Sequence, residues 1–484
     1  MVALGSYESH GEYSWRRGSG VGMAQGDPDR YQQTREESNM TALEEFAARI
    51  VSLANEPLPD AVIHETRRCF ANVLGTALGA SHSHEIDALY RAGAVLGGAE
   101  ISVLGRGEML DRYFAASALG FAAHFDDFDD THLETVIHPG AATMGALYAL
   151  GMCMDVAPDR ALAGMALGVE AQLRIGLAMT PSHYDLGWHI TGTCGVIGAA
   201  VGAGILLGLD EQQLAHAVQI ATTMSLGQRE AFGTPVKPYH AGKASANGLL
   251  SAVLAQQGVS DASDLLTDDH GYFALLADSW NTSWIEPQDL GRHWVILDNT
   301  YKPFPCGIVA HPAIEAATKL HLEFGALNLA EVERVSVACN PLVVELMGRR
   351  VVATGLEARF CAIHGVAVGL LTGLAGLAEF SDAISVDPSV VLLRDRTTLV
   401  PDEHHSRQAA TVTIHLNDGT TRAHHVAQAE GSKERPLTDA QLREKFLALV
   451  VAYFPGRAEL LWQLAMQLGD GVSFIDIDHV VRAR

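Results

Sequence analysis

The sequence predicts a mainly α-helical protein, with a large all-α domain and a smaller α+β domain inserted into it. From Thr41 to about Asp278 the chain is a succession of Ala-, Leu- and Gly-rich segments with helical spacing. Short β-branched runs appear near Trp294 and continue through the next part of the chain. A capping-box pattern at Thr438 then begins a helical tail, which we expect to pack back on the first domain.

The domain boundaries follow from these changes in residue composition and spacing. Residues 1–40 are rich in Gly, Ser, Arg and Glu, and we expect a disordered N-terminal extension. The helical domain is expected to comprise residues 41–298 and 434–484, with the α+β domain occupying residues 299–433 between them. The strand signals are Val295–Leu297, Val335–Cys339, Thr411–Leu416 and Thr420–Val426, the last two joined by Asn417-Asp418-Gly419 as in a hairpin.

Composition excludes several kinds of partner. The 484 residues are 48% hydrophobic and 19% charged, which is typical of a globular protein with large cores. The net charge of -24 argues against a nucleic-acid or anionic-membrane partner, so we expect neither. Six scattered cysteines without a CxxC pair indicate a reducing, cytoplasmic location and no structural zinc. The uncharged segment from Ile190 to Leu209 is long enough to cross a membrane, but its Gly and Ala content favours a buried helix.

An acidic stretch, Asp126-Asp127-Phe128-Asp129-Asp130-Thr131, stands out from this apolar background. His124 precedes it and His138-Pro139-Gly140 follows it. Crowded carboxylates and imidazoles shift one another's pKa values, and groups tuned in this way serve proton transfer. A solvated loop between two helices is the alternative interpretation.

Three further segments place polar groups among small residues. His189 stands directly before the uncharged helix, whose amino end favours an anion. Lys237 lies between Pro235 and Pro238, with His240 close by, and a second lysine, Lys302, precedes Pro303. Two such segments would supply the local cations that an acidic protein needs to bind an acidic substrate. Each taken alone is equally compatible with a helix cap or a solvated lysine.

Taken together, the acidic stretch with His138, the His189 turn and the two Lys-Pro segments resemble the MmgE/PrpD family, which includes 2-methylcitrate dehydratase, cis-aconitate decarboxylase and iminodisuccinate epimerase. The resemblance covers nearly the whole chain from Thr41. It implies a homodimer in which each protomer has a helical domain and an α+β lid with the active site between them. It also implies a small polycarboxylate substrate, with no metal and no organic cofactor.

The resemblance also implies which residues form the site. As catalytic residues it indicates Asp127, His138, His189, Lys237 and Lys302, and as substrate-binding residues Thr131, His240, His311 and His364. Two departures argue against an itaconate-forming enzyme. The decarboxylases have a histidine where this chain has Gly307, although His311 follows one helical turn later. They have a tyrosine where this chain has His364.

The reactions of this family build negative charge on a carboxylate next to the reacting carbon. A histidine suits the removal of the proton, and lysines suit the stabilisation of the enolate-like oxygens. We therefore expect a cofactor-independent lyase in which His189 or His138 is base or acid, Lys237 and Lys302 bind carboxylates, and Asp127 orients an imidazole.

Other functions stay open at this point. An epimerase or isomerase needs the same proton abstraction, and a non-catalytic family member would keep the fold with a decayed pocket. The Asp-Asp-Phe-Asp-Asp run also resembles the magnesium-binding aspartates of prenyl diphosphate synthases, but Asp268-Asp269 is a poor second motif. The pairs His404-His405 and His424-His425 are interpreted as surface features, because neighbours on a strand point to opposite faces.

Overall fold

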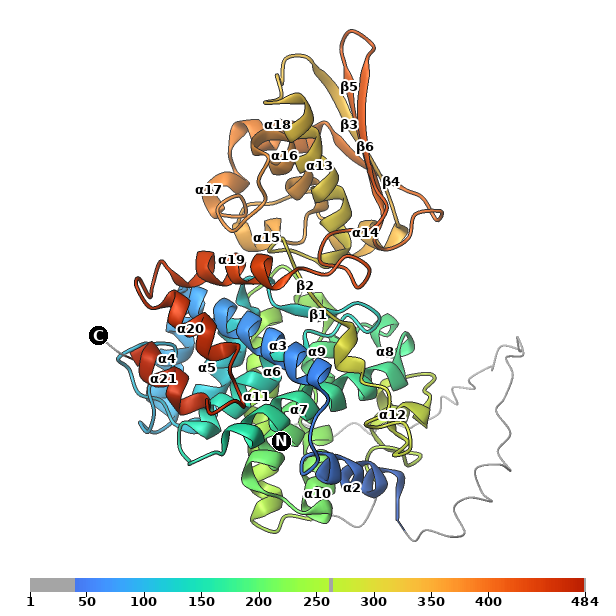
Figure 1. Ribbon diagram of the computed structural model, residues 1–484. Helices are drawn as coiled ribbons and strands as arrows, with labels where there is room; N and C mark the ends of the chain where they lie inside the picture. Colours follow the sequence, from blue (N-terminus) through green and yellow to red (C-terminus); the bar gives the residue numbers. More distant parts are fainter. Residues whose placement is uncertain (1–39, 261–263, 483–484) are drawn as a thin grey trace, which may run out of the picture. The chain divides into compact units, whose positions relative to one another are not determined.

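The computed structural model describes residues 40–260 and 264–482 (Figure 1). The expected disordered extension, residues 1–40, falls almost wholly outside these ranges. The chain from Ala42 onward forms one compact unit, and its described part contains a larger and a smaller hydrophobic core. The mainly α fold with a smaller α+β part is confirmed.

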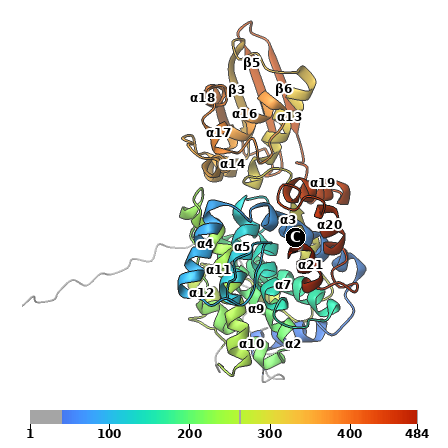
Figure 2. The same ribbon diagram turned by 90° about the vertical axis from the view of Figure 1, so that its left-hand side faces the viewer.

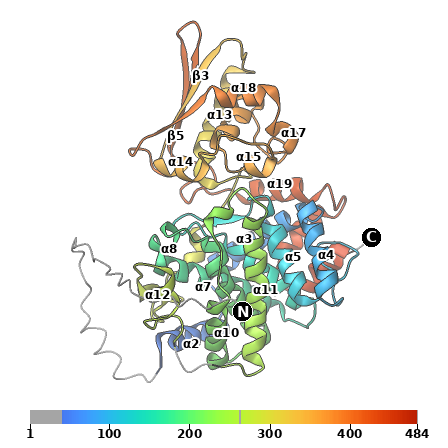
Figure 3. The ribbon, with the colours of Figure 1, turned by 180° about the vertical axis from the view of Figure 1, so that it is seen from behind.

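The larger core belongs to the helical lobe. Here α9 packs against α6, α7 and α11, and α11 also packs against α5 and α10. Figure 3, from behind, shows α11 beside α5. The helices of this lobe before the lid are α2 (Ala42–Leu53), α3 (Asp60–Gly79), α4 (His84–Leu96), α5 (Arg112–Phe125), α6 (Pro139–Gly151), α7 (Pro158–Met179), α8 (Ser182–Asp185), α9 (Ile190–Leu207), α10 (Glu211–Thr223), α11 (Val236–Gln256) and α12 (Tyr272–Leu276).

Small residues let the central helices approach closely. A Cβ added to Gly248 in α11 would come within 2.4 Å of the Ala199 Cβ in α9, and one added to Gly168 in α7 would lie 2.7 Å from the Gly198 carbonyl oxygen. By length and composition α7 and α9 pass as membrane spans, but 100% and 94% of their apolar windows are buried inside the protein. The segment from Ile190 is thus a buried helix, as its Gly and Ala content predicts.

The smaller core lies between a four-stranded sheet and its helices. The sheet order is β4-β3-β5-β6, in which β3 and β4 run parallel and the other neighbours antiparallel. Buried and half-buried residues alternate along β5 because one face covers α13 and α16. The strands are β3 (Val332–Cys339), β4 (Thr397–Pro401), β5 (Ala410–Leu416) and β6 (Thr421–Val426), and the helices are α13 (His311–Phe324), α14 (Pro341–Met347), α15 (Gly355–Ala358), α16 (Ala362–Thr372), α17 (Asp382–Ser385) and α18 (Pro388–Asp395).

The predicted hairpin is present, and one predicted strand is not. β5 and β6 pair in register around Gly419, whose φ of +84° explains the glycine at that turn. The β-branched run from Val295 instead forms a 3₁₀ turn, η3 (Val295–Asp298). Its amides at Val295 and Ile296 donate to the buried Glu170 carboxylate at 3.1 and 2.9 Å, so a side chain satisfies the backbone groups that a ladder would have paired.

The C-terminal helices share the larger core. They are α19 (Asp439–Val450), α20 (Ala458–Ala465) and α21 (Phe474–Arg482), and they lie along the flank of the helical lobe (Figure 2). Thr438 and Gln441 form the predicted capping box, in which each side chain accepts from the other residue's backbone amide. Phe446 packs against α3 so closely that a Cβ on Gly75 would lie 2.7 Å from its ring.

Replacing Phe446 by Ala should lower the free energy of unfolding by about 3–5 kcal/mol, because the change leaves a cavity between α19 and α3. Urea unfolding followed by circular dichroism measures this effect. Val451→Ala, at a position 50% exposed near the same helix end, serves as the control and should change stability by less than about 1 kcal/mol. A small effect of Phe446→Ala would show that α19 is not anchored by this ring.

Candidate active site

The acidic stretch is buried, and each of its aspartates has its own partners. Asp126 ends α5 and pairs with Arg359 from the α+β lobe at 2.7 Å. Asp130 accepts from the Asn299 amide at 2.7 Å and from the backbone amide of Gly140 at the start of α6. The stretch is therefore not a solvated loop. Asp126 and Asp130 hold neighbouring segments of the chain in place. Asp127 and Asp129 face the lysines and histidines of the site.

Asp127 is the centre of an ion-pair cluster. Its Oδ1 accepts from the ammonium groups of Lys237 and of Lys302, the latter at 3.1 Å. Lys302 also donates to the Asp127 backbone carbonyl at 3.0 Å. Burial alone would raise the pKa of Asp127, but these two cations outweigh it and hold the pKa far below its usual range. Burial lowers the pKa of Lys237, which Asp127 partly offsets.

Asp127 also has a strained backbone. Its φ of +50° lies in the left-handed region, where aspartate is tolerated better than most residues. Val136, another residue of the same site, has a φ of +53°, which is unusual for a β-branched side chain. Strain of this kind persists where the surrounding contacts over-determine the conformation, and it is frequent at functional sites.

Asp129 holds two imidazoles. Its two carboxylate oxygens lie 2.8 Å from His124 Nδ1 and 3.2 Å from His138 Nδ1, and all three side chains are buried. Burial lowers the pKa of His138 to about 3, with Asp129 opposing and Lys302 assisting the shift. His138 is therefore neutral at neutral pH.

The contacts of His138 define its protonation state. Its Nδ1 lies 3.0 Å from the Asp130 carbonyl oxygen, which can only accept, so Nδ1 carries the proton. Its Nε2 then presents a lone pair, 4.0 Å from Asp127 Oδ1. The His138 amide, at the start of α6, donates to Thr191 Oγ1 at 3.0 Å. His138 thus has the geometry of a general base at Nε2, because hydrogen bonds from its backbone amide and from Nδ1 hold the ring in place.

A two-stranded ladder brings Lys302 to this cluster. β1 (Asp130–His132) pairs antiparallel with β2 (Asn299–Tyr301), with Thr131 opposite Thr300. The ladder joins segments far apart in the sequence and ends where Lys302 begins. β1 has only three residues, all polar, so no β-propensity pattern marks it, and it was not predicted from the sequence.

The remaining polar groups of the site lie at the N-terminal ends of helices. Lys237 lies in the first turn of α11, after Pro235 and before Pro238, as the stiff sequence predicts. His189 immediately precedes α9, and its amide donates to the Gly227 carbonyl at 2.8 Å. Its ring lies 5.1 Å from that of Phe232 in an edge-on arrangement.

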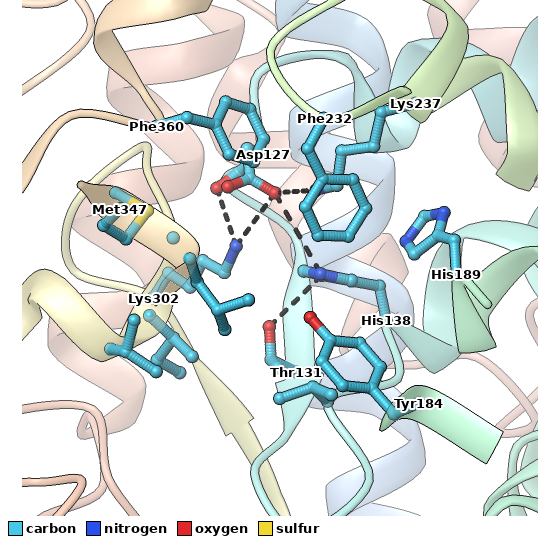
Figure 4. A pocket seen from close by; sticks show the side chains of 15 residues that line it. Asp127, Thr131, His138, Tyr184, His189, Phe232, Lys237, Lys302, Met347 and Phe360 are labelled. Carbon is cyan, nitrogen blue, oxygen red and sulfur yellow. Dashed lines mark hydrogen bonds and ion pairs between the residues drawn. The ribbon is translucent and has the colours of Figure 1, made fainter. Parts of the chain in front are cut away.

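These groups surround one cavity, whose empty space of about 480 Å³ includes part of its opening to solvent (Figure 4). In Figure 4 the side chains of Lys237, Lys302 and His138 converge on Asp127, and the Tyr184 hydroxyl points toward the same space. Of the predicted site residues, six line the cavity: Asp127, Thr131, His138, His189, Lys237 and Lys302. Gly307, named from the sequence as a departure from the decarboxylases, also lines the cavity. The rest of the lining was not predicted: Val136, Tyr184, Phe232, Ile308, Val309, Leu346, Met347 and Phe360.

The missed residues are mostly apolar, and many come from the α+β lobe, which acts as a lid. Nothing in their types distinguishes them from core residues, so pattern alone gives no signal for them. Gly307 is informative in this respect. A Cβ at this position would lie 2.3 Å from Met347 Sδ, so the thioether occupies the space that a larger residue at 307 would need. The lid therefore presents an apolar surface to the cavity here.

Three predicted substrate-binding residues lie outside the lining. His240 is behind His189, with the two Nδ1 atoms 2.9 Å apart. His311 is buried at the start of α13 in the lid, and its Nε2 lies 3.3 Å from the Cys306 carbonyl oxygen. His364 is in the core of the lid, where its Nε2 lies 2.9 Å from the Glu379 carbonyl oxygen and its ring packs on Phe380. The structure thus places these imidazoles one layer away from the cavity.

A third lysine ties the site segments together from outside the cavity. Lys445 of α19 donates to Asn72 Oδ1 at 2.8 Å, to the Phe128 carbonyl at 2.6 Å and to the Lys302 carbonyl at 3.0 Å. These acceptors use all three protons of its ammonium group. Burial lowers the pKa of Lys445 to about 7. Its contacts join the residue after Asp127 to the backbone of Lys302.

The buried carboxylates and imidazoles also have the spacing of a metal site. Ligand atoms of His124, Asp127, Asp129 and His138 lie within 4.8 Å of one another. A divalent cation there would face the ammonium groups that already contact Asp127. Repulsion between like charges at such distances is strong in a buried site. The lysines therefore take the place that a cation would occupy beside Asp127.

Comparison with known sequences defines the family. The pattern of the MmgE/PrpD N-terminal domain matches residues 44–285, and that of the MmgE/PrpD C-terminal domain matches residues 304–468. The chain belongs to the MmgE/PrpD family. The second match includes α19 and α20, which share the core of the helical lobe.

Members of this family with known activities are similar over most of their length. The cis-aconitate decarboxylase of Mus musculus is 27% identical over 84% of this chain and 86% of its own. The cis-aconitate decarboxylase of Aspergillus terreus is 26% identical over 72% of this chain and 76% of its own. The 2-methylcitrate dehydratase of Cupriavidus necator is 23% identical over 71% and 75%.

Replacing Lys445 by Met should leave three acceptors unpaired and loosen the backbone on both sides of the site. We expect a loss of about 2–4 kcal/mol in the free energy of unfolding, since each buried group without a partner costs about 1–3 kcal/mol. Chemical denaturation measures this. The control is Lys433→Met, which removes a 58%-exposed lysine paired with Asp298 and should cost at most about 1 kcal/mol. Equal losses of stability from the two changes would show that Lys445 does not hold the site segments together.

Acid should destabilise the protein from about pH 6.5 downward. Burial lowers the pKa of His138 and His311 to about 3 and that of His364 to about 4. Below pH 6.5 these histidines bind protons in the unfolded chain. In the folded chain they bind protons only near their lower pKa values, so the free energy of unfolding falls as the pH falls.

The variant His364→Gln isolates one of these contributions, since its amide can still donate to the Glu379 carbonyl. It should flatten the decline between pH 6.5 and pH 4 by up to roughly 3 kcal/mol. Denaturation of both proteins across this range measures the difference, and parallel profiles would show that His364 is not held neutral in the folded state.

Proposed function

We propose that this protein is a cofactor-independent lyase that removes water or carbon dioxide from a small di- or tricarboxylic acid, at a carbon next to a carboxylate. The observation that carries the proposal is the convergence of Lys237, Lys302, His138 and His189 on one buried cavity. The names of the relatives, which are decarboxylases and dehydratases, support the same class of reaction.

The charge around Asp127 suits an anionic substrate. Two ammonium groups face this carboxylate, so one positive charge in the cluster is left for a substrate carboxylate. As the proton leaves the adjacent carbon, negative charge grows on that carboxylate, and fixed cations in a buried site stabilise it without reorganisation. We assign this role to Lys237 and Lys302, with Asp127 holding both in place.

The two imidazoles at the cavity divide the proton transfers. His138 presents a lone pair at Nε2, and His189 Nε2 is buried without a hydrogen-bond partner among the described residues. In a dehydration, one takes the proton from carbon and the other gives a proton to the leaving hydroxyl group; in a decarboxylation, one gives a proton to the carbon that carbon dioxide has left or to its allylic position. Tyr184, whose pKa burial raises to about 12, stays protonated and adds a donor at the same space.

The apolar lining from the lid supports this chemistry. Met347 and Phe360 are buried at the cavity, and the Phe360 ring centroid lies 5.3 Å from Lys237 Nζ. A site closed by such residues excludes water, which strengthens the attraction between the lysines and the charge that develops on the substrate.

Two alternatives use the same residues. An epimerase or isomerase, for example of iminodisuccinate, would return the proton to the other face of the carbon instead of expelling a group. A non-catalytic member would bind the acid without turning it over. The magnesium-dependent prenyl diphosphate chemistry suggested by the Asp-rich run is disfavoured by the lysines on Asp127 and by the Arg359 pair on Asp126.

The biological setting is part of the proposal. We propose a homodimer in the cytoplasm, acting on a small polycarboxylate without metal, nucleic acid or membrane. All six cysteines are unpaired, which suits a reducing compartment. Exposed apolar side chains at Leu226, Val236 and Tyr239 offer a surface for a second copy.

Proton NMR in heavy water, with a panel of di- and tricarboxylic acids, tests the reaction class. A new alkene signal is expected for a dehydratase, and loss of a carboxylate is expected for a decarboxylase. Exchange of a carbon-bound proton for deuterium without loss of any group would establish the epimerase or isomerase instead. Binding with no change in any acid would leave the non-catalytic alternative.

Replacing His189 by Gln should lower kcat by about 100-fold or more, because general acid-base groups contribute about 10²- to 10⁴-fold. The far-UV circular dichroism and melting temperature should stay near those of the wild type. His321→Gln, at an imidazole in α13 that contacts the Leu370 carbonyl at 2.9 Å far from the cavity lining, is the control. Near-normal turnover by the His189 variant would remove His189 from the mechanism.

A further inference from the structure

The histidine behind His189 is placed to do more than support it. His240 lies in the second turn of α11, and its Nδ1 is 2.9 Å from His189 Nδ1. Since one nitrogen of this pair must donate and the other accept, the contact couples the protonation states of the two rings. His189 then turns its free Nε2 to the cavity.

The surrounding chain is built for this close contact. A Cβ added to Gly227 would lie 3.3 Å from His240 Nδ1 and 3.4 Å from His189 Cβ. A Cβ on Gly192 would lie 3.0 Å from His240 Cβ. Glycines therefore occupy the two positions where a side chain would press on the imidazole pair.

The partners of the two cavity histidines differ in kind. The second nitrogen of His138 faces the Asp129 carboxylate, which stabilises an imidazolium but holds its own pKa well below the usual value and is a poor proton acceptor. The second nitrogen of His189 faces a neutral imidazole, which can accept a proton. A proton taken up by His138 thus has no onward acceptor, whereas His189 can pass a proton on to His240.

The pKa values of the two rings favour the movement of a proton from His189 to His240. Burial lowers the pKa of His189 well below its usual value, and the Lys237 ammonium lowers it further. Burial and Lys243 lower the pKa of His240 to about 4. A positive charge is therefore less unfavourable on His240 than on His189, and a proton taken from the substrate gains by moving there.

We propose that His189 and His240 form a proton relay, in which His189 Nε2 takes the proton from the substrate carbon while the proton on His189 Nδ1 moves to His240 Nδ1. The electron pair of the C–H bond stays on the substrate as an enolate held by Lys237 and Lys302. His189 remains neutral throughout, and His240 becomes the imidazolium. The inference rests on the proposed function, because it requires a substrate that gives up a proton.

Variants of His240 that keep only the hydrogen-bonding ability of the imidazole distinguish a proton relay from a contact that only orients His189. Asn places a donor and an acceptor near the position of Nδ1 but does not carry a proton onward. With a relay, His240→Asn and His240→Ala should both lower kcat by about 10²-fold or more, and added imidazole should restore turnover to His240→Ala. KM should change little, since His240 lies outside the cavity lining.

Two outcomes of this comparison would overturn the relay. Near wild-type kcat for His240→Asn would show that His240 only orients His189, and near wild-type kcat for His240→Ala would show that it is not needed. Circular dichroism of each variant checks that the fold is kept. If a variant does not fold, the wild-type measurement below still decides.

Nitrogen-15 NMR of the wild-type protein labelled at histidine tests the hydrogen bond without any substrate. The relay requires that His189 in the resting protein carry its proton on Nδ1 and share it with His240 Nδ1, giving a coupling between these nitrogens. A His189 protonated on Nε2 would overturn the inference. If this signature is present but no acid in the heavy-water panel loses water or carbon dioxide, the proposed function fails and not the geometry of the pair. Loss of carbon dioxide without removal of a carbon-bound proton would overturn the relay and keep the proposed function.

Discussion

The pairing of one carboxylate with two ammonium groups is the interaction on which the site depends. Asp127, Lys237 and Lys302 come from the end of α5, the start of α11 and the end of β2, and each would be an uncompensated buried charge without the others. The left-handed backbone at Asp127, the proline-flanked turn at Lys237 and the β1–β2 ladder are the local structures that allow the three to meet.

The site divides its tasks between parts of the chain. The helical lobe supplies the imidazoles, the carboxylates and Lys237, whereas the lid supplies an apolar cover that includes Met347 and Phe360. Arg359 fixes the two together through Asp126 and the Phe125 carbonyl. Changes in the lid can therefore alter which acid fits while the proton-transfer groups stay in place. Gly307, packed against Met347, lies in this part of the site.

Sequence alone predicted the residues whose chemistry is unusual in their context. The acidic stretch, the lysines beside prolines and His189 before an uncharged helix are all conspicuous, and they meet in the cavity. His240, His311 and His364 fell one layer further back, because residue type does not tell a lining imidazole from one bound to a carbonyl or another ring. Met347 and Phe360 gave no signal, since apolar cavity walls and cores use the same side chains. The run at Val295 forms no strand because the Glu170 carboxylate, and not a ladder, accepts hydrogen bonds from its backbone amides.

The β1–β2 ladder also bears on how the protein is made. Lys302 reaches Asp127 across 175 residues of sequence, and Lys445 reaches the Phe128 carbonyl across 317. A ribosome that has produced only the first helices exposes a chain whose inward-facing aspartates have no counterions, and closing loops of this length is slow. Lys237 can pair with Asp127 once α11 is made, whereas Lys302 and Lys445 arrive later, so the helical lobe acquires its final core only after the last helices emerge.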